Sequence, residues 1–257
     1  MIETPNLTTI QYNVNKSQHK VQRSFLQALD PKKHLVIAVQ EPWINSKSNR
    51  PSTANDPRYH TLLAKQGTPR TCMYISKEMA TDSWEQIQQE GGDITSVRLN
   101  TNQGSIHIHS VYNPPPSSRS STQLGTLQQL PDILQSDSQH IVLGDFNLHH
   151  PTWGSDFAPA HHFLANRLLS TTRSNNMHLV TPKGLTTWSQ RASSSTIDLC
   201  FASHDLQQKV TRCWVNQDLE SSSDHLPIQV EFETQTQQEG DLEPQLAWKA
   251  ANWEQIR

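Results

Sequence analysis

The chain has little cysteine: 257 residues contain only Cys72, Cys200 and Cys213, and no two of them are spaced as CxxC. An odd number of thiols without that spacing predicts neither a disulfide framework nor a zinc ribbon. Isolated cysteines most often serve as small apolar side chains in the core. We therefore expect three free thiols in a chain that folds without covalent cross-links.

Long apolar runs are absent as well. No stretch approaches the roughly 18 residues of a membrane-spanning helix, and residues 1–10 lack the basic and then apolar layout of a secretion signal. We expect a soluble protein that stays inside the cell. Hydrophobic residues make up only 33% of the chain, and Ser, Thr, Gln and Asn make up the difference. The length fits one large domain with polar loops.

The chain also lacks a basic surplus. Its 21 Lys and Arg residues against 24 Asp and Glu residues give a formal net charge of -3. Nucleic-acid-binding proteins usually carry a basic patch, and the net charge of this chain does not indicate one. A metal site needs several carboxylates, however, and these would mask a basic groove in the total. The net charge therefore leaves nucleic-acid binding open.

Short apolar runs alternate with amphipathic segments along the chain, which predicts an α/β or α+β layered fold. The composition turns polar after Phe232, so we expect one domain over residues 1–233 and a polar linker with an amphipathic tail over 234–257. A helix follows the first strand and presents Val21, Phe25 and Leu29 on one face. Strands are predicted at 7–15, 35–39, 59–64, 71–76, 94–99, 105–112, 140–144, 197–202 and 228–232, and further helices at 121–135 and 161–173.

Polar residues gather where the predicted strands end. The apolar run IVLGDFN leads directly into Asp145 and Asn147, and the strand at 35–39 leads to Glu41 before Pro42 stops the ladder. Strand ends that meet at one rim would bring such groups into a single cleft on a rigid scaffold. The other residues placed in this way are Asn13, Asn15, Tyr112, Asn113, Asp198, Ser223, Asp224 and His225.

Each motif has a plain alternative when it is taken singly. GDFN can form a turn in which Asp145 and Asn147 bond the nearby backbone. Tyr112 can close a strand as a half-buried aromatic, and Asp198 can be a surface acid, although a carboxylate beside an apolar run is costly unless it is paired. Two acids and two carboxamides at strand ends, together with an Asp-His pair, favour a common site over unrelated turns.

The ordered motifs QYNVN, QEP, VYNPP, LGDFN, TIDL and SSDH resemble the exonuclease-endonuclease-phosphatase superfamily across residues 6–233. GDFNLHHPTWGS, with QEPW and STIDL, is similar to its apurinic-like branch, in particular to the endonuclease domain of non-LTR (LINE-type) retrotransposon polyproteins. LAWKAANWEQIR is similar to the segment that joins this domain to a reverse transcriptase. The resemblance implies a four-layer α/β sandwich, with two mixed β-sheets packed face to face, helices outside and the active site at one edge.

The same resemblance implies a divalent-metal-dependent endonuclease that nicks one strand of double-stranded DNA and leaves a 3'-hydroxyl for target-primed reverse transcription. Mg²⁺ is the implied cofactor, with Mn²⁺ as a substitute. The implied partners are target DNA and, in a full polyprotein, a reverse transcriptase domain and element RNA. We expect the isolated domain to be a monomer that is synthesised in the cytoplasm and acts in the nucleus. Two alternatives stay open: a superfamily phosphodiesterase of inositol-phosphate or sphingomyelin type, and a decayed fragment that binds nucleic acid without cutting it.

The resemblance also assigns a metal site. A phosphodiester gains negative charge during cleavage, and a hard divalent cation with oxygen ligands neutralises it well. The matched motifs imply Glu41 as the first ligand, with Asn13 and Asp224 as further ligands, direct or through water, and Asn15 in support.

The remaining catalytic roles follow from the same match. Asp145 is expected to orient and deprotonate the attacking water, and Asn147 to donate to a phosphate oxygen. His225, with Asp198 on its other ring nitrogen, either faces the phosphate as a cation or acts as the base. The resemblance places Tyr112 beside the leaving oxygen.

Supporting and DNA-binding residues complete the set. Thr187 is expected near the phosphate, although Thr186 matches the motif equally well, and Ser223 supports the Asp-His pair. Asn113 is expected to contact DNA. Residues 189–196 occupy the place where related endonucleases insert a hairpin into a DNA groove, so Arg191 either reads DNA there or is an ordinary solvated arginine.

Two further features call for a simple interpretation. Trp153 in HPTWGS is predicted to pack in the core rather than to stack on a base. The paired histidines at 149–150 and 161–162 are not expected to bind zinc, because adjacent side chains point apart. The first motif reads Asn13-Val-Asn15 where abasic-site repair relatives usually carry Asn-x-Asp, which argues against strong abasic-site activity.

Overall fold

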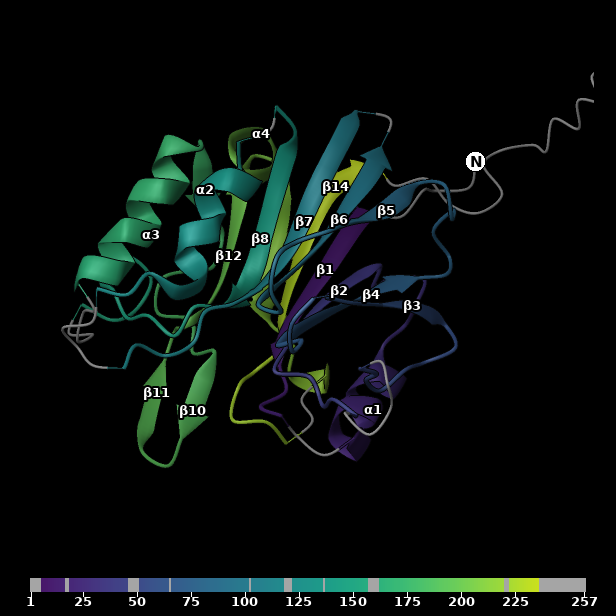
Figure 1. Cartoon of the computed structure of the whole chain (residues 1–257), viewed down its shortest axis with the longest axis horizontal. Coiled ribbons are helices and arrows are strands. Elements are labelled where there is room, and N and C mark those ends of the chain that lie inside the picture. Colours follow the sequence, from purple (N-terminus) through teal and green to yellow (C-terminus); the bar gives the residue numbers. More distant parts are fainter. Residues whose placement is uncertain are drawn as a thin grey trace, which may run out of the picture.

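Two six-stranded mixed sheets pack face to face, and helices lie on their outer surfaces (Figure 1). The predicted four-layer α/β sandwich is therefore confirmed. The structure is a computed structural model, and it describes residues 6–16, 19–45, 51–64, 66–101, 103–117, 122–135, 137–156, 162–219 and 222–235. Within these ranges, no helix is both long enough and apolar enough to cross a membrane.

The first sheet is built around a parallel pair, β1 (Asn6–Asn13) and β2 (Val36–Gln40). A parallel pair needs a crossover connection, and α1 (His19–Ala28) provides it on the outer face, where Phe25 and Leu26 are buried. The pairs β1–β14, β13–β14, β2–β4 and β3–β4 are antiparallel. The strand order is β13-β14-β1-β2-β4-β3, with β3 (Tyr59–Leu63), β4 (Thr71–Ser76), β13 (Val210–Val215) and β14 (Ile228–Gln235).

The second sheet repeats this plan around the parallel pair β7 (Gly104–Tyr112) and β8 (Gln139–Asp145). Their connection includes the 3-10 helix η1 (Gly125–Gln129) and α2 (Leu130–Ile133). The strand order is β5-β6-β7-β8-β12-β9, with β5 (Trp84–Ile87), β6 (Ile94–Thr101), β9 (Met177–Leu179) and β12 (Asp198–Ser203). The remaining elements are α3 (His162–Ser174), α4 (His204–Gln207), η2 (Gln217–Leu219), and the strands β10 (Trp188–Gln190) and β11 (Ser193–Ser195) of a separate hairpin.

Alternating side chains give each sheet two apolar faces. On β8, Ile141 and Leu143 pack into the core between the sheets, whereas Val142 packs against the helix layer of α3. Because successive strand residues point to opposite faces, a strand covered on both sides reads as a continuous apolar run. This explains why IVLG was recognisable as a strand from its sequence.

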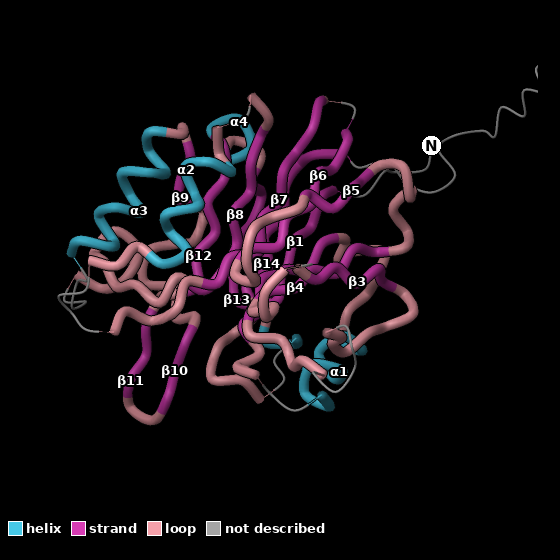
Figure 2. Tube along the Cα trace, viewed as in Figure 1, coloured by secondary structure: helices cyan, strands magenta, loops and turns pink. Residues whose placement is uncertain are grey.

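The C-terminal ends of the two parallel pairs lie at one rim of the sandwich. Asn13 pairs with Gln40 at the end of the first pair, and Tyr112 pairs with Asp145 at the end of the second. A hydrogen bond of 2.8 Å from Asn13 Nδ2 to Asp145 Oδ2 joins the two sheets there. The β10–β11 hairpin extends from the body at the same end of the molecule (Figure 2).

Two expectations about extent need correction. The predicted helix over 121–135 is wrong in length, because the structure has only η1 and α2, which together span 125–133. Gly125 has φ +54°, and Pro131 supplies no N–H to a helix ladder. β14 runs to Gln235, two residues past the predicted domain boundary. The predicted linker and tail over 236–257 lie outside the described residues.

The three cysteines are free, as predicted. Cys72 and Cys200 are fully buried, and Cys213 is half-buried on β13. Burial raises the pKa of Cys72 and of Cys213 to about 12, so both thiols stay protonated near neutral pH. Their role is packing.

Candidate active site

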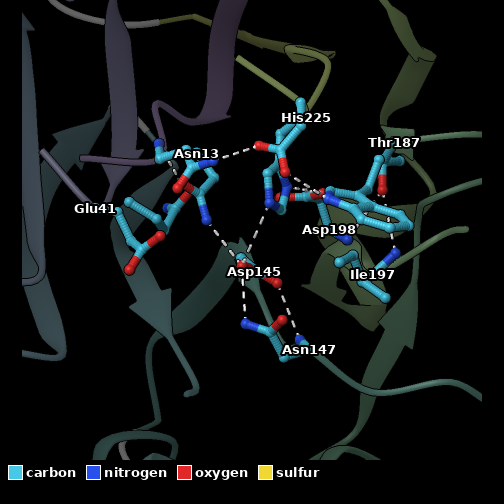
Figure 3. Close-up of polar contacts among 12 residues, drawn as sticks. Asn13, Glu41, Asp145, Asn147, Thr187, Ile197, Asp198 and His225 are labelled. Carbon is cyan, nitrogen blue, oxygen red and sulfur yellow. Dashed lines mark hydrogen bonds and ion pairs between the residues drawn. The ribbon is translucent and has the colours of Figure 1, made fainter. Parts of the chain in front are cut away.

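The polar residues predicted from the strand ends converge on this rim (Figure 3). Asp145 ends β8 and Asp198 begins β12, and the two are direct partners in the antiparallel ladder. His225 lies just before β14 and forms an isolated bridge with Trp188. Three separate parts of the chain therefore deliver the two carboxylates and the imidazole to one place.

Asp145 is almost fully buried, with 1% of its surface exposed, and amide donors hold both of its oxygens. Oδ1 accepts the backbone N–H of Asn147 at 2.9 Å. Oδ2 accepts Asn13 Nδ2 at 2.8 Å and Asn147 Nδ2 at 2.9 Å. Because these bonds come from both sheets, the carboxylate has one fixed orientation.

The GDFN segment does form a turn, as the plain alternative proposed, and the turn is part of the site. Asn147 adopts φ +51°, a conformation that asparagine tolerates better than most residues. Its Nδ2 also donates to the carbonyl of Asn113 at 3.0 Å, and Asn113 Nδ2 donates to the carbonyl of Phe146 at 2.8 Å. Asn113 is only 3% exposed, so the geometry gives it a bracing position, and its predicted contact with DNA stays a prediction.

Asp198 holds His225 from the side opposite Asp145. Its Oδ2 lies 2.8 Å from Nδ1 of His225, while Nε2 of the same ring lies 3.9 Å from Asp145 Oδ2. The second oxygen of Asp198 accepts Gln11 Nε2 at 2.7 Å. Asp198 is fully buried, and it is paired as a carboxylate at such a position must be.

Burial and charge shift the two titrating groups that face each other across the site. Burial, reinforced by the neighbouring Asp198, raises the pKa of Asp145 to about 8, although His225 opposes this shift. For His225, burial lowers the pKa, but the negative charges of Asp198, Asp145 and Asp224 outweigh it and raise the pKa to about 9. The imidazole is therefore cationic at neutral pH, and Asp145 can exchange a proton there.

Thr187 and Ser223 position this pair. The Thr187 hydroxyl oxygen accepts the backbone N–H groups of Ile197 and Asp198, both at 3.1 Å, and the residue is fully buried. Thr186, the competing match, is exposed. Ser223 Oγ donates to the Asn13 carbonyl at 2.8 Å and accepts the His225 N–H at 3.2 Å. Ser223 thus ties the histidine loop to the end of β1.

Glu41 lies at the edge of the site, in a left-handed backbone conformation with φ +47°. Its Oε1 is 3.0 Å from Lys16 Nζ. Tyr112 ends β7 nearby, and burial together with the Glu41 carboxylate raises the pKa of its hydroxyl above the usual value. Arg70 lies over the Tyr112 ring at 5.2 Å from its centroid and is paired with both oxygens of Asp93.

Asp224 and Asn15 form the outer part of the site. Asp224 Oδ1 accepts Asn15 Nδ2 at 2.8 Å, and Oδ2 accepts the indole N–H of Trp188 at 2.9 Å. The Asn15 backbone N–H in turn donates to Asn13 Oδ1 at 2.7 Å. Both oxygens of Asp224 and Oδ1 of Asn13 therefore already accept hydrogen bonds. Glu41 has Lys16 at one oxygen and a side-chain hydrogen bond with Tyr112.

The donor set suits a hard divalent cation. Asp145, Asp198 and His225 have potential ligand atoms within 4.8 Å of one another, but Asp198 uses both oxygens on Gln11 and His225. Glu41 and Asn13 offer oxygen atoms, which Mg²⁺ prefers to imidazole nitrogen. Lys16, the ion-pair partner of Glu41, has a 71% exposed side chain and is free to move aside. Glu41, Asn13 and Asp224 are the residues that would hold the ion, directly or through water.

The β10–β11 hairpin carries Arg191 at its turn. Arg191 has φ +56° and is exposed. A cavity of about 510 Å³ lies between the hairpin and the loop that contains His149 and Gly154. The predicted reading of DNA by this segment stays a prediction, but the segment is a hairpin and its arginine is accessible.

Trp153 anchors the HHPTWGS loop, and the packing prediction for it is confirmed. The side chain is fully buried, and its indole N–H donates to the Leu148 carbonyl at 3.0 Å. His150 Nδ1 accepts the Thr152 N–H at 3.0 Å, which gives this histidine a local structural bond. His161 and the side chain of His162 lie outside the described part of the chain.

Sequence reasoning missed three residues of the site: Gln11, Arg70 and Trp188. Gln11 had a usable signal, because it precedes Asn13 by two residues on a strand and therefore shares its face. Trp188 ends the LTTW motif next to Thr187. Arg70 had no local signal, since only the pairing of the sheets brings it over Tyr112.

Comparison with solved structures identifies the fold. The endonuclease domain of TRAS1, a telomere-specific non-LTR retrotransposon, matches at 19% identity with a TM-score of 0.69, over 90% of this chain and 100% of that domain. The AP endonuclease LMAP of Leishmania major matches at 15% identity and 0.67, over 89% and 88% of the two chains. The catalytic domain of Xenopus laevis APE2 matches at 14% identity and 0.66, over 91% and 94%. No curated protein sequence matches the chain significantly.

The chain therefore shares the fold of these endonucleases, and its rim brings together two carboxylates and an imidazole. Residues 106–229, which contain Tyr112, Asp145, Asp198 and His225, match the family model described as endonuclease-reverse transcriptase. The match covers slightly less than half of the chain, and the fold is similar to that of a retrotransposon endonuclease domain. The resemblance inferred from the ordered motifs is confirmed.

Proposed function

We propose that the chain is a divalent-metal-dependent endonuclease that nicks one strand of double-stranded DNA by hydrolysis and leaves a 3'-hydroxyl end. One observation carries the proposal. Asp145, fixed by amide donors from both sheets, faces the ring of His225 across 3.9 Å, and Asp198 holds the far nitrogen of that ring at 2.8 Å. Asp145, as a proton acceptor, and His225, as a cationic hydrogen-bond donor, thus face each other in the site.

Asp145 has the properties of a general base for water. A general base works best when its pKa lies near the working pH, and burial raises the pKa of this carboxyl to about 8. The amide groups of Asn13 and Asn147 hold its oxygens in place, so an attacking water would meet a carboxylate of fixed orientation. We therefore assign removal of the proton of the attacking water to Asp145.

His225 has the properties of a transition-state donor rather than a second base. Its pKa of about 9 keeps the ring protonated at neutral pH, and Asp198 occupies Nδ1, so Nε2–H is free to face a phosphate oxygen. Preorganised donors of this kind stabilise charge that develops during the reaction. Of the two roles open from the sequence, the cationic one agrees with this electrostatic setting.

The anionic substrate would lie along the edge formed by Glu41, Lys16 and Arg70. When bound at Glu41, Mg²⁺ supplies Lewis-acid neutralisation of the phosphate oxygens. Lys16 and Arg70 lie on the same side, where they are paired with Glu41 and Asp93, and the Tyr112 hydroxyl keeps its proton. A divalent cation at Glu41 would release Lys16 to contact a phosphate.

We further propose that the nick serves target-primed reverse transcription in the nucleus, with a reverse transcriptase domain and element RNA as partners in a longer polyprotein. Support comes from the family description, which couples endonuclease and reverse transcriptase. A 3'-hydroxyl is the end that a reverse transcriptase extends, so the product of the proposed hydrolysis matches that use.

The test is conversion of supercoiled plasmid to open circles with Mg²⁺, with EDTA, and with the variants Asp145→Asn and His225→Gln. We expect nicking only with the divalent cation, and a loss of about 10²- to 10⁴-fold in each variant. The new ends should be extended directly by a DNA polymerase, which requires a 3'-hydroxyl.

Asp156→Asn and His178→Gln are matched controls, because each removes the same kind of group from an exposed position. Both should nick at the wild-type rate. A folded wild type that leaves plasmid intact under these conditions, or ends that a polymerase cannot extend, would contradict the proposal. Hydrolysis of inositol phosphates or sphingomyelin by that protein would instead support the alternative phosphodiesterase.

A further inference from the structure

A second group of titratable side chains lies away from the active site, on the second sheet. His107 and His109 are on β7, and His140 on β8 is the direct register partner of His107. Their strand neighbours Ile106 and Ile108 point into the core between the sheets, so the three rings lie on the opposite, outer face. His140 precedes Asp145 by five residues of strand, which places the cluster roughly 16 Å from the catalytic rim.

The three rings converge on one another. His109 Nε2 and His140 Nδ1 are 3.1 Å apart. Potential ligand nitrogens of all three histidines lie within 4.8 Å of one another. Two nitrogens bound to one tetrahedral Zn²⁺ at 2.0–2.1 Å would stand about 3.3 Å apart. The observed distance between His109 Nε2 and His140 Nδ1 is close to this value. A metal ion could therefore replace the proton between the two rings, and neither strand would need to move far.

Ser96 supplies the outer contact that such a site needs. Its Oγ lies 2.7 Å from His109 Nδ1. An oxygen that accepts from Nδ1 leaves the lone pair on Nε2, the nitrogen that faces His140, and outer hydrogen bonds of this kind orient metal-bound histidines. Burial also lowers the pKa of His109 and of His107, so these rings are in the neutral form that binds metal.

The nearest fixed charges do not oppose a cation strongly. Arg98, the ladder partner of His107 on β6, lies close to the cluster, and its charge also lowers the pKa of His107. Its Nη2 is paired with Glu85 Oε1 at 2.9 Å. The two charges therefore largely offset each other at the exposed side of the site, where His107 is only partly buried.

We propose that His107, His109 and His140 form a transition-metal site, separate from the active site, that binds Zn²⁺ or a similar ion. Three imidazoles without a carboxylate suit Zn²⁺, Ni²⁺ or Cu²⁺, and they do not suit Mg²⁺, which requires oxygen ligands. Water completes four-coordination on the half-open side of His107. Such an ion clamps β7 to β8, the parallel pair whose far end carries Tyr112 and Asp145.

The experiment is equilibrium dialysis of the chain, without any polyhistidine tag, against Zn²⁺ in excess Mg²⁺, with bound zinc measured by atomic emission. We expect one tightly bound Zn²⁺ per chain. His107→Gln and Ser96→Ala should each weaken binding by at least about 10-fold. At free Zn²⁺ about 100-fold above its dissociation constant, the Tm of the wild type should rise by about 5–10 °C.

Two variants locate the ion. His178→Gln removes one of another close pair, His178 and His204, whose ring nitrogens are 3.3 Å apart on the surface, and it should leave zinc binding unchanged. His225→Gln probes the active site and should also leave it unchanged. Zinc that is retained in His107→Gln, or lost in His178→Gln or His225→Gln, would overturn the proposal. Melting of each variant without metal shows whether it is folded.

Discussion

Asp145 and His225 are two groups whose charges depend on each other. Burial and the charge of Asp198 raise the pKa of Asp145, and His225 opposes this shift. Burial lowers the pKa of His225, but the charges of Asp198, Asp145 and Asp224 outweigh it and raise that pKa. The folded state raises the His225 pKa from 6.5 to about 9. This interaction stabilises the fold fully below pH 6.5, and the stabilisation is lost as the pH rises through about 9.

The first prediction concerns Asp198→Asn. Removing this charge takes away the main attraction that holds a proton on His225, while burial still disfavours the cation, so the pKa of His225 should fall. A ring-nitrogen NMR titration without metal measures it directly. We also expect the alkaline limb of nicking to move to lower pH. An unchanged His225 titration would contradict the assignment of Asp198 as the group that keeps the ring cationic.

Backbone strain also gathers at single residues of the site. Among the described residues, Asn15, Lys16, Glu41 and Asn147 are four of the seven non-glycine residues with positive φ. Asparagine adopts this region readily, whereas Lys16 and Glu41 occupy it at a cost. Strain of this kind persists where surrounding bonds hold it, and here the Lys16 N–H bonds the Glu41 carbonyl at 2.8 Å.

At the scale of loops, Trp153 anchors the HHPTWGS loop in the core. The second prediction is that Trp153→Ala unfolds this loop and lowers the free energy of unfolding by about 3–5 kcal/mol, because it removes a fully buried indole and its hydrogen bond. Urea denaturation measures the loss. Phe163→Ala on α3 is the matched control, since Phe163 is 54% exposed, and it should cost far less. DNA binding lost in Trp153→Ala at unchanged Tm would indicate a stacking role instead.

The third prediction concerns the β10–β11 hairpin. Arg191 is exposed at its turn, so Arg191→Ala should change which sites on a plasmid are nicked while Tm stays the same. Arg191→Asn separates the loss of charge from backbone strain, because asparagine tolerates positive φ. Arg173→Ala, an exposed arginine on α3, is the control. The same nick pattern in all variants would make Arg191 an ordinary solvated side chain.

The charge of the whole molecule limits how it binds DNA. With a net charge of -3, affinity must come from a few exposed cations such as Lys16 and Arg191. The fourth prediction is that binding is weak and falls steeply with salt, by roughly 10³-fold between about 50 and 200 mM if six phosphates are contacted. Fluorescence anisotropy with a labelled duplex measures the slope. Binding that is independent of salt would contradict a phosphate-dominated interface.

Most of the fold follows from local patterns in the chain. Short continuous apolar runs such as those in residues 35–39 and 140–144 are recognisable because both faces of their strands are covered. Of the strands that were missed, β5 and β9 are short, and β5 and β13 are half-exposed edge strands. An edge strand depends on pairing with its neighbour as well as on the β-propensity of its own residues. The local sequence of an edge strand therefore predicts it poorly.

The ordered motifs predicted the superfamily and the sandwich through their resemblance to known members. The placement of Asp145, Asn147, Asp198 and His225 predicted a common site, because strand ends in a layered sheet meet at a rim. The bond from Gln11 to Asp198, which joins residues 187 positions apart, was not predictable in this way. Nor was the bracing position of Asn113 or the meeting of His107, His109 and His140. These contacts depend on the register and pairing of distant strands, and many side chains satisfy a local strand pattern equally well, so tertiary structure alone decided them.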